Sequence, residues 1–550
     1  MAGTNLDVLL VGIDAACLPV LRRLEETESI PTLSSLLADG TSGPLESQLP
    51  PWTPSAWPSL YTGTNPGKHG AFSFLEYDGY DWDVVDAASV AEPALWEILD
   101  AEGLSSVVVN VPVTHPAADI DGAVVPGFVG PEDPRCTPPG LLSNLREELG
   151  GYRVYADNEF AGDAPRDARV SEYRDLVRSR GGAFRYLADR FDPDFGFLQF
   201  QQTDTVFHDM PGDFDAVRSV YEAVDEQVAE TLAATDPTHV VLASDHGMGE
   251  FDRHEFRVNE FLREHGYVET TRDEAGMPSW VPLWRDSLGG GDDADGGSDG
   301  DEPDSDAPGL AERGVAALSA LGLSPARAAG ALEAVGLLGA ARRFAPEGVV
   351  SAAGVSERVD FAESTAYMRL PVELGIRLNV AGREPEGVVP PDEYESVRAD
   401  LVDLLSGVTT PDGDPVFERV VPREEVFDGP HVADAVDIVT VPAGFENFPA
   451  AQLRGDVFGA PGEPWNHKLH GVVGVSGPDV PERETSDAHL LDVAPTVLSL
   501  LGVPLSDRME GSPLVGDRPP TRAYDRPDRE QTDAPGEGVE AHLANLGYLD

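Results

Sequence analysis

Short apolar runs with polar or glycine-rich flanks recur along both halves of the chain. Residues 7–13 read DVLLVGI, residues 107–111 read VVVNV, and residues 239–243 read HVVLA. Runs of this length without alternation are typical of strands that are buried on both faces of a parallel sheet. A segment with helical spacing of apolar positions follows the first run, at residues 18–24. This pattern predicts an α/β fold.

The same periodicities predict further elements in both halves of the chain. Strands are expected at residues 195–200, 375–380, 436–441 and 472–475. Helices are expected at residues 55–61, 253–267, 394–405 and 492–501. Because both halves contribute strands, we expect a three-layer α/β/α sandwich around one large, mostly parallel central sheet.

Composition divides the chain into five parts. Residues 286–308 consist mainly of Gly, Asp and Ser, so they are expected to form a disordered acidic linker. Residues 309–350 have helical spacing and are expected to form a helical insertion or cap. The main core then combines residues 1–285 with residues 351–515, and residues 516–550 form a tail rich in Pro, Asp and Arg.

The chain is strongly acidic. It has 38 Lys and Arg residues against 98 Asp and Glu residues, a formal net charge of -60. Such a surface repels nucleic acid and anionic lipid, so no nucleic-acid-binding surface is expected. High salt screens the repulsion between like charges, so this composition predicts a halophilic source.

Cysteine content and hydropathy bear on the compartment. The two cysteines, Cys17 and Cys136, are too few for a disulfide framework. The first apolar run ends in Asp14 and lacks the features of a signal peptide, and no apolar stretch reaches 18 residues. We therefore expect a cytoplasmic protein without a membrane span. The pattern leaves the oligomeric state open.

A threonine stands at the start of one predicted helix. In TPSAWPSLYTGTNPGKHG, Thr53 directly precedes Pro54, and proline is favoured at the first helical position. Thr53 is therefore expected to be the N-cap, with its hydroxyl at the helix end where backbone N–H groups attract phosphate. A purely structural cap is the alternative interpretation. His69, in the same stretch, is interpreted as structural.

Carboxylate and imidazole side chains gather where predicted strands end. They are Asp14, Asp204, His208, Asp245, His246 and His467. If a helix begins near Thr203, the spacing of four places Asp204 and His208 on one face of it. Mixed Asp and His ligands suit Zn²⁺, or else Mn²⁺, better than Ca²⁺. Taken singly, Asp14 could be a loop residue and the Asp204–His208 pair a coincidence. Together, these residues could hold two divalent ions that act on a small phosphate ester, with Thr53 as the attacking group.

The motifs, in order, resemble the alkaline phosphatase superfamily and, within it, the type I phosphodiesterase/nucleotide pyrophosphatase branch. The motifs that carry the resemblance are TPSAWPSLYTGTNPGKHG, TDTVFH, SDHG, GREPEGVV, HKLHGVVGVSGP and DVAPTVLSLLGVP. The resemblance implies an alkaline phosphatase-like fold and hydrolysis of phosphodiester or pyrophosphate bonds through a phospho-threonine.

The resemblance also assigns the metal ligands. It implies that Asp14, Thr53, Asp245 and His246 hold one ion. It implies that Asp204, His208 and His467 hold the other. His467 is preferred to His470 because the family's ligand lies four residues before the glycine that opens the next strand, here Gly471.

The sequence departs from the family beside the nucleophile. Ala56 and Trp57 stand where the resemblance implies Asn and His, so Asn110 becomes the candidate substrate-binding donor, with Lys68 or backbone N–H groups as alternatives.

These departures leave the reaction type open within the superfamily. A phosphomonoesterase or phosphomutase is the first alternative, although family mutases usually carry a serine nucleophile. A sulfatase would need a Cys or Ser nucleophile followed by Arg, and a non-catalytic member would not need the complete ligand set.

Overall fold

The computed structural model describes residues 6–156, 164–271, 357–527 and 529. The chain divides into one unit of residues 1–269 and 361–550 and a second unit of residues 270–360. In the second unit, the described residues form strands β11 (Thr270–Thr271) and β12 (Arg358–Val359), which pair antiparallel. The predicted linker 286–308 and the predicted insertion 309–350 lie outside the described residues.

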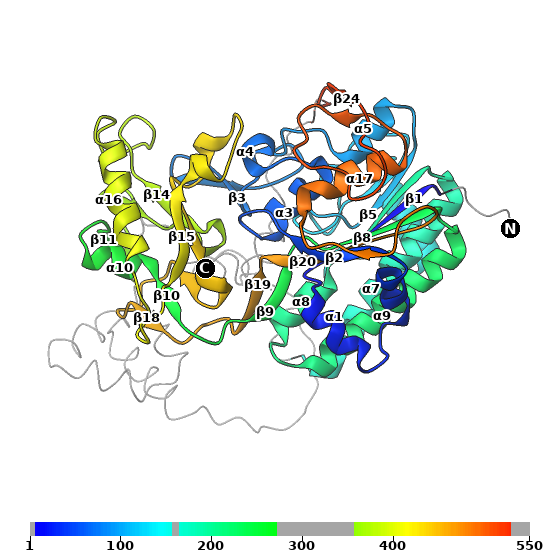
Figure 1. Ribbon diagram of the computed structural model, residues 1–550, viewed down its shortest axis with the longest axis horizontal. Coiled ribbons are helices and arrows are strands. Elements are labelled where there is room, and N and C mark those ends of the chain that lie inside the picture. The colour runs from blue at the N-terminus through cyan, green and yellow to red at the C-terminus, as the bar shows by residue number, and fades with distance from the viewer. Residues whose placement is uncertain (1–5, 157–163, 272–356, 528, 530–550) are drawn as a thin grey trace, which may run out of the picture. The chain divides into compact units, whose positions relative to one another are not determined.

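A nine-stranded sheet forms the centre of the described part of the first unit (Figure 1). Its strands are β1 (Val8–Ile13), β2 (Gly40–Glu46), β5 (Ser106–Val109), β6 (Gly122–Val125), β7 (Phe195–Phe200), β8 (His239–Ala243), β20 (His470–Ser476), β21 (Arg483–Glu484) and β22 (Ala488–His489). Their order is β21-β2-β20-β8-β1-β7-β5-β6, and β22 also pairs with β2.

The sheet is mostly parallel, and β1 lies at its centre. β1 pairs parallel with β7 on one side and with β8 on the other, so Gly12 lies between Gln199 and Ala243. β20 runs antiparallel to both β8 and β2. The predicted large, mostly parallel sheet with strands from both halves of the chain is confirmed.

Helices cover both faces of this sheet. The helices of the first unit are α1 (Leu18–Glu25), α2 (Pro31–Ala38), α3 (Thr53–Thr62), α4 (Pro66–His69), α5 (Leu95–Ala101), α6 (Leu141–Leu149), α7 (Arg166–Phe191), α8 (Gln202–Asp209), α9 (Phe214–Thr235), α10 (Val258–Glu264), α16 (Tyr394–Ser406) and α17 (Val493–Leu500). Helices α2, α7 and α9 pack on one face and α3, α5 and α17 on the other (Figure 1).

Shorter elements complete the first unit. The remaining strands are β3 (Leu75–Asp78), β4 (Asp81–Val84), β9 (Gly247–Glu250), β10 (Glu255–Arg257), β13 (Ala366–Tyr367), β14 (Gly375–Leu378), β15 (Phe417–Pro422), β16 (Ile438–Pro442), β17 (Phe448–Ala450), β18 (Phe458–Gly459), β19 (Trp465–Lys468), β23 (Leu505–Ser506) and β24 (Thr521–Arg522). The 3₁₀ helices are η1 (Pro371–Glu373), η2 (Arg423–Glu425), η3 (Val432–Asp434), η4 (Ala443–Phe445) and η5 (Leu490–Asp492).

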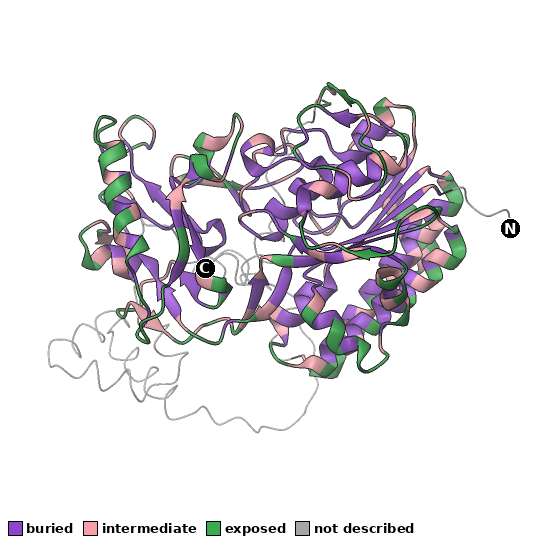
Figure 2. Ribbon diagram, in the orientation of Figure 1, coloured by how far each residue is buried: buried purple, intermediate pink, exposed green. Residues whose placement is uncertain are grey.

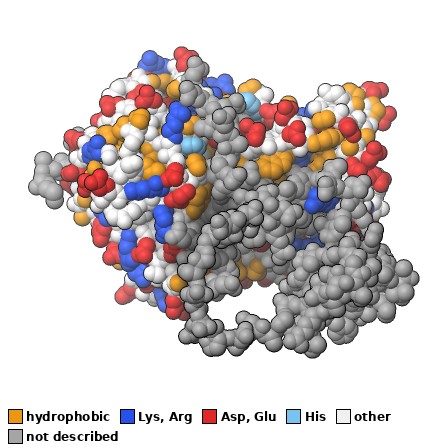
Figure 3. Space-filling model, turned by 180° about the vertical axis from the view of Figure 1, so that it is seen from behind, with side chains coloured by type: hydrophobic (Ala, Val, Ile, Leu, Met, Phe, Trp, Pro, Cys, Tyr) orange, Lys and Arg blue, Asp and Glu red, His pale blue; other side chains and the backbone are white. Residues whose placement is uncertain are grey.

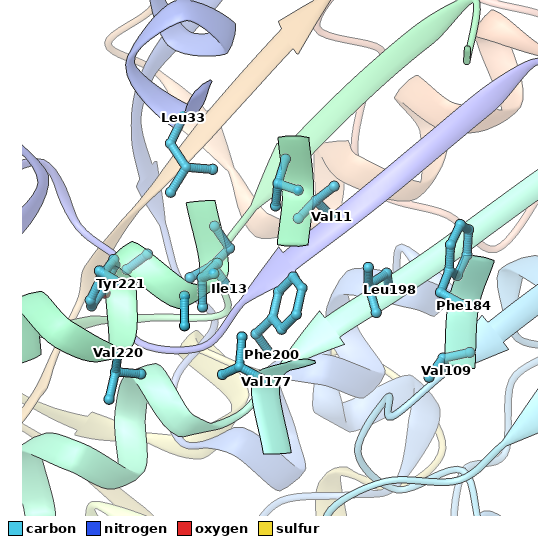
Figure 4. Packing of buried hydrophobic residues seen from close by; sticks show 14 of the residues in the cluster. Val11, Ile13, Leu33, Val109, Val177, Phe184, Leu198, Phe200, Val220 and Tyr221 are labelled. Atoms are coloured by element: carbon cyan, nitrogen blue, oxygen red, sulfur yellow. The ribbon is translucent and has the colours of Figure 1, made fainter. Parts of the chain in front are cut away.

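The core lies between the central sheet and the helix pair α7 and α9. Alternate residues of β1, including Val11 and Ile13, point toward this layer, where they meet Val177 of α7 and Val220 of α9 (Figure 4). The central strands β1, β5 and β7 are buried along their whole length, whereas exposed residues gather on the outer faces of the helices (Figure 2). Burial on both faces explains why these strands read as continuous apolar runs.

Two local predictions differ from the structure. Residues 253–267 were expected to form one helix, but β10 precedes α10 because residues 255–257 pair with β17 and β18. Thr53 is the first residue of α3 rather than its N-cap, which is Trp52.

The first residues of the predicted tail 516–550 contact the body of the unit. β24 pairs with β23, and the Tyr524 hydroxyl donates to Glu102 over 2.9 Å. None of the helices in the described part of the chain is both long and apolar enough to cross a membrane.

Charged side chains of both signs lie side by side on the described surface (Figure 3). Ion pairs such as Arg218–Asp215, at 2.7 Å, join an exposed arginine to an acidic neighbour. The few Lys and Arg side chains therefore lie among the abundant carboxylates of the described surface.

The NPGKHG turn encloses a buried histidine. The His69 Nδ1 accepts from the Ala71 backbone N–H over 3.2 Å, so its Nε2 carries the hydrogen and donates to Ser59 Oγ over 2.8 Å. Burial, with a smaller contribution from His431, lowers the pKa of His69 from 6.5 to about 3. The neutral ring makes both hydrogen bonds. Protonation would add a hydrogen to Nδ1, which would then face the Ala71 backbone N–H.

The low pKa of His69 predicts a loss of stability in acid. The neutral ring contributes stability that is complete above pH 6.5 and is lost as the pH falls toward about 3. Over this window, one group contributes a slope of up to about 1.4 kcal/mol per pH unit to the free energy of unfolding. Urea titrations between pH 7 and 4.5 measure the free energy of unfolding. In His69→Gln, the pH dependence of this free energy should lack the slope that His69 contributes. Replacing the exposed His470 by Gln is the control and should keep the wild-type slope.

Adjacent glycines in α7 predict opposite effects on stability. A Cβ on Gly181 would lie 2.5 Å from Gln227 Oε1 and 2.9 Å from Gln227 Cβ of α9, whereas a Cβ on Gly182 would meet Leu149 at 3.5 Å. Gly181→Ala should therefore lower the free energy of unfolding by about 1–3 kcal/mol through overpacking. Gly182→Ala should raise it by about 0.5–1 kcal/mol because alanine favours the helix. Urea unfolding in molar salt measures both values, and equal effects would contradict the close approach of α7 to α9.

Candidate active site

The candidate ligands from the first half of the chain meet at one edge of the central sheet. Asp14 follows β1, and Asp245 and His246 follow β8. Helix α8 begins directly after β7 and carries Asp204. Because β7, β1 and β8 are neighbouring parallel strands, their carboxyl ends bring these side chains together.

His467 reaches the same edge through a pairing between distant segments. In β19 it lies opposite Met248 of β9, which follows His246 directly. The His467 ring stacks on the His246 ring with centroids 3.7 Å apart. His470 is exposed at the start of β20, opposite Glu46. The structure thus brings His467, and not His470, to the cluster.

The side chains form two potential ligand groups. One contains Asp204, His208 and His467, and the other Asp14, Asp204 and His246. Within each group, the potential ligand atoms lie within 4.8 Å of one another.

Contacts inside the first group centre on one carboxylate oxygen. His208 Nε2 lies 3.4 Å and His467 Nε2 3.5 Å from Asp204 Oδ1, and the two Nε2 atoms are 3.1 Å apart. The His467 Nδ1 donates to the Pro51 carbonyl over 2.9 Å, so its Nε2 carries the lone pair that faces Asp204.

In the second group, His246 contacts Asp14, and it also contacts Asp245, the acid that follows β8 but is not part of this group. His246 Nε2 lies 3.5 Å from Asp14 Oδ1 and 3.2 Å from Asp245 Oδ2. The backbone N–H of Ala15 donates to Asp245 Oδ1 over 3.3 Å, and the Ser47 hydroxyl donates to the Asp245 carbonyl.

Several buried polar atoms of the site have no hydrogen-bond partner among the described residues. They are Asp14 Oδ1, Thr53 Oγ1, both carboxylate oxygens of Asp204, Asp245 Oδ2 and His246 Nε2. A buried polar atom without a partner costs about 1–3 kcal/mol, and a charged one more. Divalent cations would satisfy all these atoms at once, and Asp and His are the ligand types that Zn²⁺ accepts. The residues therefore fit bound metal.

Two residues close to Thr53 in the sequence each contact one residue of the two groups. Pro51 accepts from His467, and Trp57, one turn after Thr53 in α3, donates from Nε1 to Asp14 Oδ2 over 2.9 Å. Thr53 itself is fully buried in the first turn of the helix. Its hydroxyl is therefore at the positive end of the helix dipole, as expected, although Trp52 is the N-cap.

Burial and mutual repulsion disturb the acids of the site. Burial, followed by the charges of Asp245 and Asp204, raises the pKa of Asp14 well above its usual value. Burial and the charge of Asp204 likewise raise the pKa of Asp245.

The other acid and the imidazoles shift according to their partners. Burial opposes ionisation of Asp204, but His208 and His467 together outweigh it, through their charges and hydrogen bonds, and hold the pKa of Asp204 well below its usual range. Burial lowers the pKa of both His246 and His467. Neutral imidazoles are the form that binds metal.

Asn110, the candidate substrate-binding residue, makes its side-chain hydrogen bonds to Gln199, next to the candidate metal ligands. Its Nδ2 donates to Gln199 Oε1 over 2.7 Å and to the Gln199 carbonyl over 3.3 Å. The structure therefore joins Asn110 to Asp14 through Gln199, whose Nε2 donates to Asp14 Oδ2 over 2.9 Å. Of the alternative donors, Lys68 contacts the Arg508 carbonyl at 3.1 Å.

The sequence reasoning missed the side chains that hold Asp14. Trp57 was interpreted only as a departure from the family pattern. Gln199 is the polar residue in the buried strand FGFLQF, and a buried amide needs partners, so its position was a readable signal. The hydrogen bond from the Trp57 indole to Asp14 could not be predicted from the local sequence, because the two residues are 43 positions apart.

A parallel sheet covered by helices, with buried Asp and His side chains at its strand ends, is a fold and site suited to metal-dependent hydrolysis of phosphate esters. The sequence profile of the family "Type I phosphodiesterase / nucleotide pyrophosphatase" matches residues 8–296, and the chain belongs to this family. It is therefore a phosphoester hydrolase. The search of curated proteins gave no significant match.

Solved structures share the fold at low sequence identity. Wild-type alkaline phosphatase PafA is 14% identical over 94% of this chain and 99% of its own, with a TM-score of 0.50. Phosphonoacetate hydrolase from Sinorhizobium meliloti, in complex with phosphonoformate, is 15% identical over 89% and 94%, with a TM-score of 0.48. Inactive murine ectonucleotide pyrophosphatase/phosphodiesterase 5, in complex with AMP, is 13% identical over 92% and 98%, with a TM-score of 0.47.

Two neighbouring histidines allow a matched test of metal binding. His467→Ala removes a ligand atom from the first group, so we expect it to lower bound zinc from two equivalents toward one. His470→Ala, three residues away and exposed, should keep both equivalents. Elemental analysis after dialysis against trace Zn²⁺ in molar salt measures the difference. Equal zinc content in the two variants would remove His467 from the ligand set.

Proposed function

We propose that this protein hydrolyses phosphodiester or pyrophosphate bonds in small-molecule substrates, with Thr53 as the nucleophile and two divalent cations as cofactors. Asp14, Thr53, Asp245 and His246 hold one cation. Asp204, His208 and His467 hold the other. The observation that carries the proposal is the set of buried polar atoms, on the candidate ligands and on the Thr53 hydroxyl, that have no hydrogen-bond partner among the described residues.

The donor set favours zinc over harder cations. Imidazole nitrogen and carboxylate oxygen together suit Zn²⁺, with Mn²⁺ second, whereas Ca²⁺ and Mg²⁺ select oxygen alone. When bound, the two ions supply the positive charge that stabilises the attacking and leaving oxygens of an in-line displacement at phosphorus.

The residues of the chain account for the two steps of the reaction. Thr53 Oγ1 attacks phosphorus and forms an O–P bond, while the substrate P–O bond breaks with its electrons going to the leaving oxygen; the proton lost by Thr53 is taken up by the alcohol or phosphate that leaves. In the second step, water attacks the phospho-threonine and Thr53 regains its proton. The position of Thr53 in the first turn of α3 places the phosphoryl group by the positive end of the helix.

The contacts on either side of Thr53 support its role as nucleophile. Pro51 is fixed by His467 and Trp57 by Asp14, so the backbone around Thr53 is tied to one residue of each ligand group. A nucleophile held in place before substrate arrives avoids much of the entropy cost of reaching the attacking geometry.

Replacing Thr53 tests the proposal directly. We expect Thr53→Ala to lower kcat for bis-p-nitrophenyl phosphate by about 10³-fold or more, since it removes the group that forms the covalent intermediate. Thr53→Ser keeps the hydroxyl and should retain measurable turnover. Assays belong in molar salt with Zn²⁺ or Mn²⁺, which suits a chain of net charge -60.

Two controls define what would contradict the proposal. Thr62→Ala makes the same change at the other end of α3 and should keep turnover near wild type. Unchanged turnover in Thr53→Ala would reject the nucleophile. A higher kcat/KM for mono-p-nitrophenyl phosphate than for the diester would replace the diesterase assignment by a monoesterase.

A further inference from the structure

The two carboxylate oxygens of Asp14 have different surroundings. Oδ2 accepts hydrogen bonds from Trp57 Nε1 and Gln199 Nε2, each at 2.9 Å. Oδ1 has no hydrogen-bond partner among the described residues and lies 3.5 Å from His246 Nε2. Two donors on one oxygen fix the carboxylate about its χ2 torsion, so that a single oxygen faces the ligand group.

The amide of Gln199 is fully used and can point only one way. Its Oε1 accepts from Asn110 Nδ2 at 2.7 Å, and its Nε2 donates to Asp14 Oδ2 and, at 3.2 Å, to Gln201 Oε1. An amide nitrogen has two hydrogens, and both have an acceptor here. Asn110 therefore decides which end of the Gln199 amide faces Asp14.

The residues of this hydrogen-bonded chain lie on or directly after neighbouring strands of the sheet. Gln199 lies opposite Gly12 in the register of β7 with β1, and Asn110 directly follows β5, which pairs with β7 on the other side. The Asn110 backbone has φ +65, a conformation that Asn and Asp adopt more readily than other residues with a side chain. Its N–H donates to the Val125 carbonyl at 2.9 Å, which fixes the residue to the next strand.

The second donor to Asp14 Oδ2 ties it to the helix of the nucleophile. Trp57 is fully buried in α3, and a Cβ on Gly12 would lie 2.6 Å from its Cη2 atom, so glycine at this position of β1 makes room for the indole. The Asp14 carboxylate is thus held from the sheet by Gln199 and from α3 by Trp57.

We propose that Gln199 is a positioning residue for metal binding, that Asn110 sets its orientation, and that together with Trp57 they hold Asp14 so that Oδ1 alone is presented to the metal. This inference rests on the proposed function for the identity of the site. It assigns to Asn110 an action through Gln199 in place of direct contact with substrate. Such outer contacts to a ligating carboxylate typically change metal affinity by about 10–100-fold.

The main experiment measures zinc affinity, by competition with a chelating dye, in the full-length protein in molar salt. Gln199→Met keeps the length of the side chain and removes its hydrogen bonds. We expect the dissociation constant of one of the two zinc equivalents to rise by about 10–100-fold. Gln227→Met is the matched control, because Gln227 is also buried but lies between α7 and α9. It should leave both constants within about twofold of wild type, the usual error of such comparisons.

A second variant tests whether Asn110 acts on Asp14 by orienting the Gln199 amide. Asn110→Asp keeps a residue type that accepts the backbone conformation but replaces the amide donor by a carboxylate. The Gln199 amide must then turn over to donate to position 110, which directs its oxygen at Asp14 Oδ2. We expect zinc affinity to fall in the same direction as in Gln199→Met. In the double variant, Asn110→Asp should add less than about a twofold change, because the amide through which it acts is gone.

The outcomes separate this inference from the proposed function. Wild-type zinc constants in both Gln199→Met and Asn110→Asp would overturn the positioning role, whatever the activity. Additive effects in the double variant would overturn the orienting role of Asn110. Two zinc equivalents in wild type without hydrolysis of any phosphate ester would overturn the proposed function alone. If Gln199→Met does not fold, Trp57→Phe, which keeps a ring and removes the indole donor, takes its place and should weaken zinc binding in the same direction.

Discussion

Three carboxylates buried beside one another repel, and this repulsion governs the organisation of the candidate active site. Asp14, Asp204 and Asp245 are fully buried, and the charges of the others raise the pKa of Asp14. His208 offsets the charge of Asp204, but Oδ1 of Asp14 and Oδ2 of Asp245 have no hydrogen-bond partner among the described residues. Burial removes the solvent screening that lets the acidic surface tolerate its charge. The site is therefore suited to bind cations, and without them the repulsion lowers the stability of the protein.

The parallel sheet is what makes such a cluster possible. Side chains that follow β1, β7 and β8 converge because the three strands are neighbours and run in one direction. The apolar residues of the strands and of α7 and α9 supply the burial that keeps this edge in place against the repulsion (Figure 4). The acids could not be grouped in this way on an isolated hairpin, because a hairpin would leave them in water.

Helix α3 and the residues before it connect Thr53, the proposed nucleophile, to both potential ligand groups. Pro51 precedes the helix and accepts from His467, whereas Trp57 lies one turn inside it and donates to Asp14. Thr53 lies between these two contacts. The large indole at position 57, which departs from the family pattern, has its place because Gly12 leaves room in the sheet. The departure from the pattern therefore coincides with a contact that the site uses.

The amino-acid sequence by itself determined most of the elements that carry the candidate site. Apolar runs ending in Asp14 and in Asp245-His246 identified buried strands with candidate ligands at their ends, and the four-residue spacing of Asp204 and His208 placed both on one helix. These signals are local, because strand and helix periods are properties of neighbouring residues.

Only the tertiary structure decided which of the distant residues meet. His467 enters the cluster because β19 pairs with β9, a segment more than 200 residues away, whereas His470 begins β20 and lies opposite Glu46 of β2. Trp57 and Gln199 reach Asp14 for the same kind of reason, as does Asn110 through Gln199. Such contacts follow from the burial of the whole core and from strand register, and neither property is encoded in a short stretch of sequence.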